Sequence, residues 1–186
     1  MDNKIMNTEQ GHWILAKMGK RVLRPGGIEL TSQLINELSI TPHDKLVEFA
    51  PGIGYTAAVI LSQKPKTYNG IELNEEAAKN VEIKFKHFPN AKIINRSAAD
   101  TGLEDNSVDK VIGEAMLTMQ ADHRKSEIIR EANRVLKKGG LYGIHELGLK
   151  PDDIEVGIKN TIQRGLAQTI KVNARPLTKA EWCKLL

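Results

Sequence analysis

An apolar run that breaks into a glycine turn at residues 47–57 constrains the fold of this chain more than any other stretch. The run ends at Ala50 and Pro51, and Gly52 and Gly54 follow before a pattern typical of a helix begins. Glycine lacks a Cβ, so the backbone can adopt a positive φ here and a ligand can approach the main chain closely. The first amide groups of the next helix then point toward that ligand. The stretch therefore predicts a strand, a tight turn and a helix that together bind a cofactor.

Two glutamates stand at the ends of successive predicted strands. Glu48 lies inside the first apolar run, and Glu72 closes the next one. The spacing Gly52-x-Gly54-x-x-Ala57 also fits a dinucleotide fingerprint, and a purely structural turn is a further interpretation. A pair of carboxylates at neighbouring strand ends favours a cationic ligand that carries hydroxyl groups.

The chain from residue 28 to residue 147 alternates predicted helices with predicted strands. Strands are expected at 45–50, 67–73, 91–95, 108–113 and 141–147. Helices are expected at 28–38, 55–62, 74–85 and 122–138, the last with a stop at Gly139 and Gly140. This alternation predicts an α/β, Rossmann-like, doubly wound and mostly parallel sheet with strand order 3-2-1-4-5. Ligands bind such sheets beyond the carboxyl ends of the strands, between the first strand and the fourth.

Four stretches of the sequence carry a resemblance to a known family. They are the acidic glycine turn 48–54, the second strand end 70–74, the fourth strand 107–112 and the helix end 131–140. Together they resemble the class I S-adenosylmethionine-dependent methyltransferases. Within that class they are similar to the small-molecule group (methyltransferase type 11) to which the ubiquinone and menaquinone methyltransferases belong.

The resemblance implies S-adenosylmethionine as the cofactor and gives roles to the residues around the turn. Gly52 and Gly54 let the backbone pass the cofactor, and Glu48 lies near its methionine amino end. Glu72 accepts hydrogen bonds from both ribose hydroxyls. The implied cofactor-binding set is Glu48, Ala50, Gly52, Gly54, Glu72, Leu73, Ser97, Ala98 and Glu114.

Two positions depart from the family pattern. Ala50 replaces the first glycine of the motif, a change that is tolerable if this residue keeps an ordinary φ. Ser97 stands where an acidic residue often meets adenine. The resemblance therefore implies that the Ser97 hydroxyl or the backbone of Ala98 contacts the adenine.

The chemistry of methyl transfer leaves few candidates for catalysis. The methyl group sits on a sulfonium and is already electrophilic, so the enzyme mainly aligns an acceptor with it. Three residues at strand ends are candidate bases: His145, Glu114 and Glu146. Histidine titrates near neutrality, which suits a base, although a structural histidine is the alternative. The remaining histidines show no metal-ligand spacing, so no metal is expected.

Two other functions stay open from the residues alone. The turn and Glu72 also suit a NAD(P)-dependent oxidoreductase, but none of the three tyrosines is followed by lysine four residues later. A non-catalytic cofactor-binding module could use the same fold. Residues 113–116 lack the Asn/Asp-Pro-Pro-aromatic tetrapeptide of enzymes that methylate amino groups of nucleic acids, so a small-molecule acceptor is expected.

The length and composition predict one soluble domain. Its 186 residues divide into an N-terminal helical cap at 1–40, a cofactor-binding core at 45–147 and a C-terminal helical segment at 150–186. Lys and Arg are scattered, so the net charge of +4 does not indicate a nucleic-acid partner. Cys183 is the only cysteine, which favours a reducing cytoplasm. The sequence shows neither a signal peptide nor the roughly 18 apolar residues of a membrane span.

The two ends of the chain give weaker expectations. Arg24 could meet a carboxylate of the ligand, with a solvated arginine as the alternative. Residues 150–173 predict a helix with an apolar stripe. The stripe could cover the acceptor side of the cleft and form a lid together with the Trp13 region. Alternatively, it could simply cover the sheet. The stripe consists of Ile154, Ile158, Ile162 and Leu166.

The chain end affects the expected edge of the sheet. Residues 178–181 form a capping-box pattern that opens a last helix containing Trp182. Similar methyltransferases continue into an antiparallel strand pair, which is missing after Leu186, so a truncated or shortened chain is expected. The exposed fifth strand would then be covered by residues 150–173 or by a second copy in a homo-oligomer.

Overall fold

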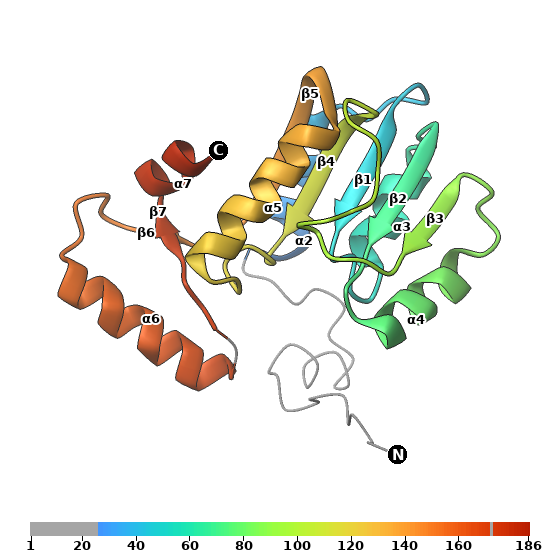
Figure 1. Ribbon diagram of the computed structural model, residues 1–186. Coiled ribbons are helices and arrows are strands. Elements are labelled where there is room, and N and C mark those ends of the chain that lie inside the picture. The colour runs from blue at the N-terminus through green and yellow to red at the C-terminus, as the bar shows by residue number, and fades with distance from the viewer. Residues whose placement is uncertain (1–25, 172) are drawn as a thin grey trace.

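A five-stranded parallel sheet forms the centre of the computed structural model, which describes residues 26–171 and 173–186 (Figure 1). Its strand order is β3-β2-β1-β4-β5, as predicted. The strands are β1 (Lys45–Phe49), β2 (Thr67–Ile71), β3 (Ala91–Ile94), β4 (Val108–Glu114) and β5 (Leu136–His145). The expected helix near Trp13 and the role of Arg24 lie outside the described residues.

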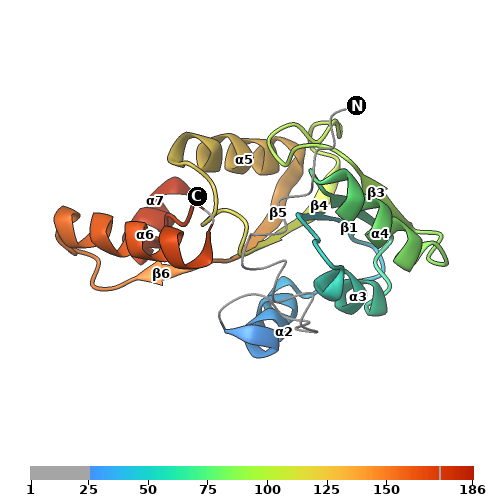
Figure 2. The ribbon, with the colours of Figure 1, turned by 90° about the horizontal axis from the view of Figure 1, so that it is seen from below.

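Helices cover both faces of this sheet. The described residues form the helices α2 (Gly27–Leu38), α3 (Tyr55–Ser62), α4 (Glu75–Phe85), α5 (Asp122–Val135), α6 (Val156–Ile170) and α7 (Lys179–Leu185), of which α6 does not pack on the sheet. Figure 2 shows α5 on one face and α2 and α3 on the other. Two apolar clusters fill these layers, one between the sheet and α5 and one between the sheet and α2, α3 and α4. Within the described residues, no helix is both long and apolar enough to cross a bilayer.

Two of the helices, α4 and α7, begin at capping residues that can be recognised in the sequence. The Asn74 side chain accepts a hydrogen bond from the Ala77 amide at 2.9 Å and caps α4. At α7, Thr178 and Glu181 exchange backbone and side-chain hydrogen bonds as a capping box. Both helix starts confirm the sequence prediction.

The boundary between α5 and β5 differs from the prediction. The helix was expected to reach residue 138 and the strand to begin at 141, but α5 ends at Val135 and β5 begins at Leu136. Leu136 already pairs with Val108, and the register then shifts before Lys110 pairs with Leu141. Gly139, at φ 81°, lies in this irregularity instead of ending a helix.

The C-terminal segment does not extend the main sheet. The short strands β6 (Gly148–Leu149) and β7 (Leu177–Thr178) pair in parallel as a separate sheet. The views in Figures 1 and 2 place α6 away from β5. Ile158 and Ile162 are 52% and 36% exposed, so the prediction that this stripe packs over the sheet is wrong. β5 remains an edge of the described sheet, and its pairing with a second copy stays a prediction.

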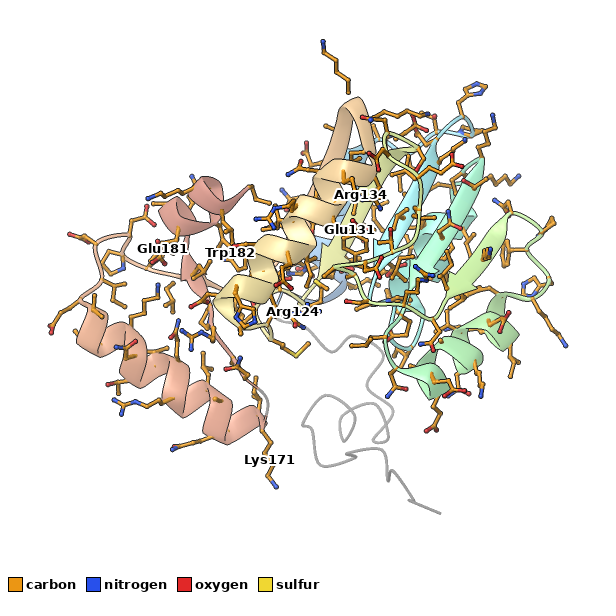
Figure 3. All side chains as sticks on the ribbon, viewed as in Figure 1. Arg124, Glu131, Arg134, Lys171, Glu181 and Trp182 are labelled. Carbon is orange, nitrogen blue, oxygen red and sulfur yellow. The ribbon has the colours of Figure 1, made fainter. Side chains whose placement is uncertain are left out.

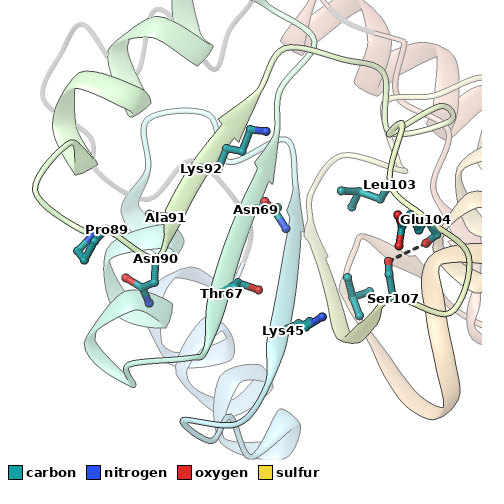
Figure 4. Close-up of a pocket in the computed structure, with 11 residues that line it drawn as sticks. Lys45, Thr67, Asn69, Pro89, Asn90, Ala91, Lys92, Leu103, Glu104 and Ser107 are labelled. Atoms are coloured by element: carbon teal, nitrogen blue, oxygen red, sulfur yellow. Dashed lines mark hydrogen bonds between the residues drawn. The ribbon is translucent and has the colours of Figure 1, made fainter.

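An open hollow lies on the part of the sheet formed by β1, β2 and β3, beside the loop that follows β3. The segment 95–107 between β3 and β4 is a loop, and a hollow of about 420 Å³ lies beside it (Figure 4). Lys45 and Thr67, the first residues of their strands, line it together with Asn69 and Lys92. The hollow therefore lies toward the amino ends of the strands, away from the predicted cofactor site.

Candidate functional site

The glycine turn between β1 and α3 leaves room for a ligand at Gly52 and is tightly packed at Gly54. Gly52 and Gly54 take φ values of 55° and 73°. A Cβ on Gly54 would lie 2.8 Å from Phe85 Cε2, so this glycine is required for packing. A Cβ on Gly52 would meet nothing closer than the Ala50 carbonyl oxygen at 3.9 Å. The main chain is therefore accessible at Gly52, where the cofactor was predicted to pass.

Ala50 departs from the expected backbone. Its φ is 53°, so the condition under which alanine would be tolerable at this position, an ordinary φ, is not met. Its amide donates to the Ile71 carbonyl at 2.8 Å, which holds the conformation at the end of β1. Ala115 takes the same conformation at φ 51°, and its amide donates to the His145 carbonyl at 2.8 Å. The two central strands, β1 and β4, thus both end in a left-handed alanine.

Glu72 is held in a fixed orientation at this turn. Its carboxylate accepts the amide of Gly52 at 3.2 Å and the amide of Asn74 at 3.0 Å. Its burial raises the pKa of the carboxyl group, against the effect of these hydrogen bonds. The neighbouring Leu73 is 70% exposed and offers an apolar surface beside the carboxylate. A carboxylate has about four acceptor positions, so these backbone contacts leave acceptor capacity on Glu72.

Glu48 lies deeper than Glu72. It is 4% exposed and accepts the Tyr68 hydroxyl at 2.6 Å. Burial, followed by the nearby Glu48 charge, raises the pKa of Tyr68 well above its ordinary value. The buried Glu48 carboxylate therefore lies in the strand that leads into the glycine turn.

Ser97 and Ala98 follow β3, and an arginine from another element joins them. The Ser97 hydroxyl accepts the Ala99 amide and Arg124 Nη2, both at 3.2 Å, while Ala98 is buried. Arg124 lies in the first turn of α5, at the end of that helix nearest the carboxyl ends of the strands (Figure 3). Sequence reasoning missed Arg124, because only the packing of α5 brings it to Ser97.

Glu114 and His145 form a hydrogen-bonded pair at the ends of β4 and β5. His145 Nδ1 lies 3.0 Å from Glu114 Oε1, and their side chains are 11% and 6% exposed. Thr31 of α2 donates its hydroxyl to Glu114 at 2.8 Å, and Thr56 of α3 donates its own at 2.6 Å. Neither threonine was predicted from the sequence, which carries no local signal for either contact.

A cavity of about 120 Å³ lies beside His145. Its lining residues are Gly26, Leu30, Ala115, His145, Glu146, Leu147 and Gly148. A Cβ on Gly26 would lie 3.1 Å from His145 Nε2, so this nitrogen faces Gly26. The imidazole therefore has one nitrogen on Glu114 and the other toward residues that line the cavity.

Glu146 has a different environment from His145. Its carboxylate accepts the amides of Met116, Leu117 and Thr118 at 2.8–3.0 Å, and the Thr118 hydroxyl at 2.6 Å. Burial raises the pKa of Glu146, while these four donors act in the opposite direction. The residue thus fixes the turn that follows β4.

The family profile described as a methyltransferase domain matches residues 47–144, which is more than half of the chain. The chain belongs to the class I methyltransferases. Membership in this family favours the S-adenosylmethionine interpretation of the glycine turn over the nicotinamide one. It also places the matched region over the strands that carry the site, β1 to β5.

Two sequence relatives and one solved structure align with most of this chain. An uncharacterized protein of Haemophilus influenzae is 34% identical over 177 residues, covering 94% of this chain and 68% of the relative. An uncharacterized methyltransferase of Synechocystis is 28% identical over 137 residues, or 73% and 63% of the two chains. The YcgJ protein of Bacillus subtilis shares the fold, with a TM-score of 0.73 at 17% identity over 83% of this chain and 64% of that one. The chain thus spans about two thirds of the length of these proteins.

Proposed function

We propose that this chain transfers a methyl group from S-adenosylmethionine to a small-molecule acceptor by in-line displacement. The observation that carries the proposal is the Glu72 carboxylate, held by two backbone amides beside the accessible main chain at Gly52. A fixed carboxylate that keeps free acceptor positions suits the two ribose hydroxyls of this cofactor.

The residues around Glu72 fit the other parts of the cofactor. Glu48 and Glu72 provide negative charge for its cationic groups, and the exposed Leu73 provides an apolar surface. Ser97 and Ala98 follow β3, and the family resemblance implies that the adenine binds there. When bound, the cofactor supplies an electrophilic methyl group. Glu114 and the turn from Ala50 to Gly54 complete the proposed binding set.

Among the three candidate bases, the geometry favours His145. A charged Glu114 can only accept hydrogen bonds, so Nδ1 carries the proton toward it and Nε2 remains available to take one from an acceptor. Glu114 orients the imidazole, and Thr31 and Thr56 orient Glu114. Glu146 is occupied by backbone amides, which assigns it to holding the turn beside the cavity.

The size of the cavity limits the part of the acceptor that can reach His145. At about 120 Å³ it is slightly smaller than the apolar cavities of about 150 Å³ that bind benzene. Only the reacting end of an acceptor fits beside His145, and the rest of the molecule would extend outside.

Calorimetric titration of S-adenosylhomocysteine, the demethylated cofactor, tests the cofactor assignment on which this function depends. We expect Glu72→Ala to weaken binding more than tenfold, because a charged acceptor of two hydroxyl groups contributes roughly 1.5–3 kcal/mol. The exposed Glu82→Ala on α4 is the matched control and should leave the affinity unchanged. Equal affinity in wild type and Glu72→Ala, or tight binding of NAD instead, would overturn the proposal.

A further inference from the structure

The strand order sets the direction in which the base of a bound cofactor points. This step rests on the proposed function, in which the ribose hydroxyls bind Glu72 at the end of β2 and the methyl group faces the cavity beside His145. The sulfur and the base are attached to opposite sides of the ribose ring. In the sheet, β1 and β4 lie between β2 and the strand that carries His145, whereas β3 is the neighbour of β2 on the other side. The base therefore points toward the residues that follow β3.

Ser97, in the loop after β3, offers that base a hydrogen-bond donor. A serine hydroxyl has two acceptor lone pairs and one proton. The Ala99 amide and Arg124 Nη2 both donate to the Ser97 oxygen, each at 3.2 Å. The two acceptor positions are therefore occupied, and the proton remains for another partner. The Ala98 amide, which makes no hydrogen bond to any described residue, is a second donor in the same place.

Arg124 keeps Ser97 in this role. Its side chain is 39% exposed, and Nη1 donates to Glu127 one turn further along α5, which fixes the guanidinium against Ser97. A guanidinium has N–H donors and no acceptor. The Asp100 carboxylate, in the same loop as Ser97, is 83% exposed and lies 3.7 Å from the Arg96 guanidinium. Arg124 is thus a positioning residue, which acts on a bound base through the Ser97 hydroxyl.

We propose that Ser97, oriented by Arg124, donates a hydrogen bond to a ring nitrogen of the adenine, and that the 6-amino group of the base is not what this site selects. The ring nitrogens of the six-membered ring and N7 are acceptors, whereas the 6-amino group is a donor. A donor at Ser97 pairs with the first kind of atom and not with the second. A cofactor whose base lacks the 6-amino group is therefore bound as well as one that carries it.

Calorimetric titration of S-adenosylhomocysteine and of its base analogues tests this recognition in the wild-type chain. We expect the 6-deamino analogue, with hydrogen in place of the amino group, to bind within about threefold of S-adenosylhomocysteine. At least one of the 1-deaza, 3-deaza and 7-deaza analogues should bind about tenfold more weakly, because it leaves the Ser97 donor unpaired.

An acidic residue at position 97 should reverse the selection. Ser97→Asp should prefer S-adenosylhomocysteine over the 6-deamino analogue by more than about tenfold, since a carboxylate accepts the amino group. Ser62→Asp, at the exposed end of α3, is the matched control and should keep the wild-type ratio.

The role of Arg124 is measured by the same ratio of affinities. Arg124→Leu frees one lone pair of Ser97, so the hydroxyl can turn and accept the 6-amino group. We therefore expect this variant to prefer S-adenosylhomocysteine over the 6-deamino analogue by about fivefold. Arg124→Lys retains a donor and should keep the wild-type ratio, as should Arg130→Leu at an exposed position of α5. An unchanged ratio in Arg124→Leu, with or without an equal loss of affinity for both ligands, would overturn the positioning role.

Two results with the wild-type chain would overturn the recognition itself. The first is a loss of affinity of about tenfold or more when the 6-amino group is removed. The second is binding of all three deaza analogues as tightly as S-adenosylhomocysteine. If S-adenosylhomocysteine does not bind the wild-type chain at all, the proposed function fails instead.

Discussion

Ala50 and Ala115 carry backbone strain at the point where the two central strands end. Both residues have φ values near 50°, a region that costs an L-residue with a Cβ on the order of 1 kcal/mol. Each is held there by an amide hydrogen bond to a neighbouring strand segment, through Ile71 and His145. The strain therefore lies between the glycine turn and the cavity, where β1 and β4 lie side by side.

Replacement of Ala50 by glycine should relieve this strain. We expect Ala50→Gly to raise the free energy of unfolding by up to about 1 kcal/mol, since the added entropy of the unfolded chain offsets part of the gain. Ala58→Gly, on the exposed side of α3, is the matched control and should lower it by about 0.5–1 kcal/mol. Urea unfolding measures both values. An equal loss of stability in the two variants would show that Ala50 is unstrained.

The raised pKa of Glu72 gives cofactor binding a pH dependence. Ribose binding needs the charged carboxylate, so we expect affinity for S-adenosylhomocysteine to fall as the pH drops through a pKa above 4.5. The stability of the free protein changes in the opposite sense. Burial disfavours the charged form, so the destabilisation due to Glu72 is present above its raised pKa and is relieved as the pH falls.

Titrations between pH 7 and pH 5 check this expectation. Glu72→Gln should bind S-adenosylhomocysteine weakly. Its affinity should change little with pH, because the side chain at position 72 no longer titrates. A pH dependence of affinity that is identical in wild type and Glu72→Gln would assign it to another group.

The predictable part of the site is local in sequence, and the unpredicted part is not. Gly52 and Glu72 belong to short motifs at strand ends, so their positions followed from the pattern of residues. Arg124, Thr31 and Thr56 reach the site from three helices, and only tertiary packing brings them there. The backbone of Ala50 was also missed, because an alanine gives no sequence signal for a positive φ.

At the scale of elements, one buried glutamate ties the loop between β3 and β4 to α5. Glu131 accepts the Thr101 amide at 2.8 Å and the Thr101 hydroxyl at 2.6 Å. Arg134 donates to both Glu131 oxygens, at 2.7 and 2.8 Å, and also contacts Asp105 (Figure 3). These contacts, led by the Arg134 hydrogen bonds, lower the pKa of Glu131 to about 2.

Loss of this carboxylate should destabilise the fold in a pH-dependent way. A pKa lowered from 4.5 to about 2 corresponds to about 3 kcal/mol at pH 7, and screening of the partly exposed Arg134 reduces this to about 2 kcal/mol. The contribution is complete above pH 4.5 and is lost as the pH falls toward 2. We expect Glu131→Gln to lower the free energy of unfolding by about 2 kcal/mol at pH 7.

Urea unfolding at pH 7 and pH 3 measures the difference. The gap between wild type and Glu131→Gln should be smaller at pH 3, and the exposed Glu82→Gln should show no gap at either pH. A gap that is constant with pH would mean that packing, and not charge, holds the loop.

Element types were predictable wherever the apolar period was clear. The strands of the sheet and the helices between them appear close to their expected ranges, because alternation and caps are local signals. The end of α5 was missed because Gly139 serves a bulge that depends on pairing with β4. The apolar stripe of α6 has a helical period, but periodicity does not reveal which surface a helix contacts.

At the scale of the whole molecule, the C-terminal segment forms a lobe beside the sheet. Trp182 of α7 packs into the cluster under α5 and donates its indole N–H to the Leu147 carbonyl at 3.1 Å. Arg175 pairs with Asp122 at the start of α5. In contrast, α6 buries only Gln163 among its residues and leaves much of its apolar side chains exposed.

Substitutions on α6 should therefore change the free energy of unfolding much less than substitutions on α5. We expect Ile158→Ala to change the free energy of unfolding by less than about 0.5 kcal/mol, because its side chain is half exposed. Ile128→Ala, at a buried position of α5, should cost about 2–5 kcal/mol. Thermal and urea unfolding compare the two. A large loss for Ile158→Ala would show that α6 packs against the core in solution.

Thr31 of α2 contacts Glu114, which in turn orients His145, the proposed base. The helix α2 itself packs mainly against the edge strand β5. If α2 opens locally while the sheet stays folded, Glu114 loses one of the hydroxyl groups that orient it, and Gly26 and Leu30 leave the cavity wall. Such partial openings cost less free energy than global unfolding. If His145 is the base, we expect the fraction of molecules able to remove a proton to follow the docking equilibrium of α2 and to fall before the protein as a whole denatures.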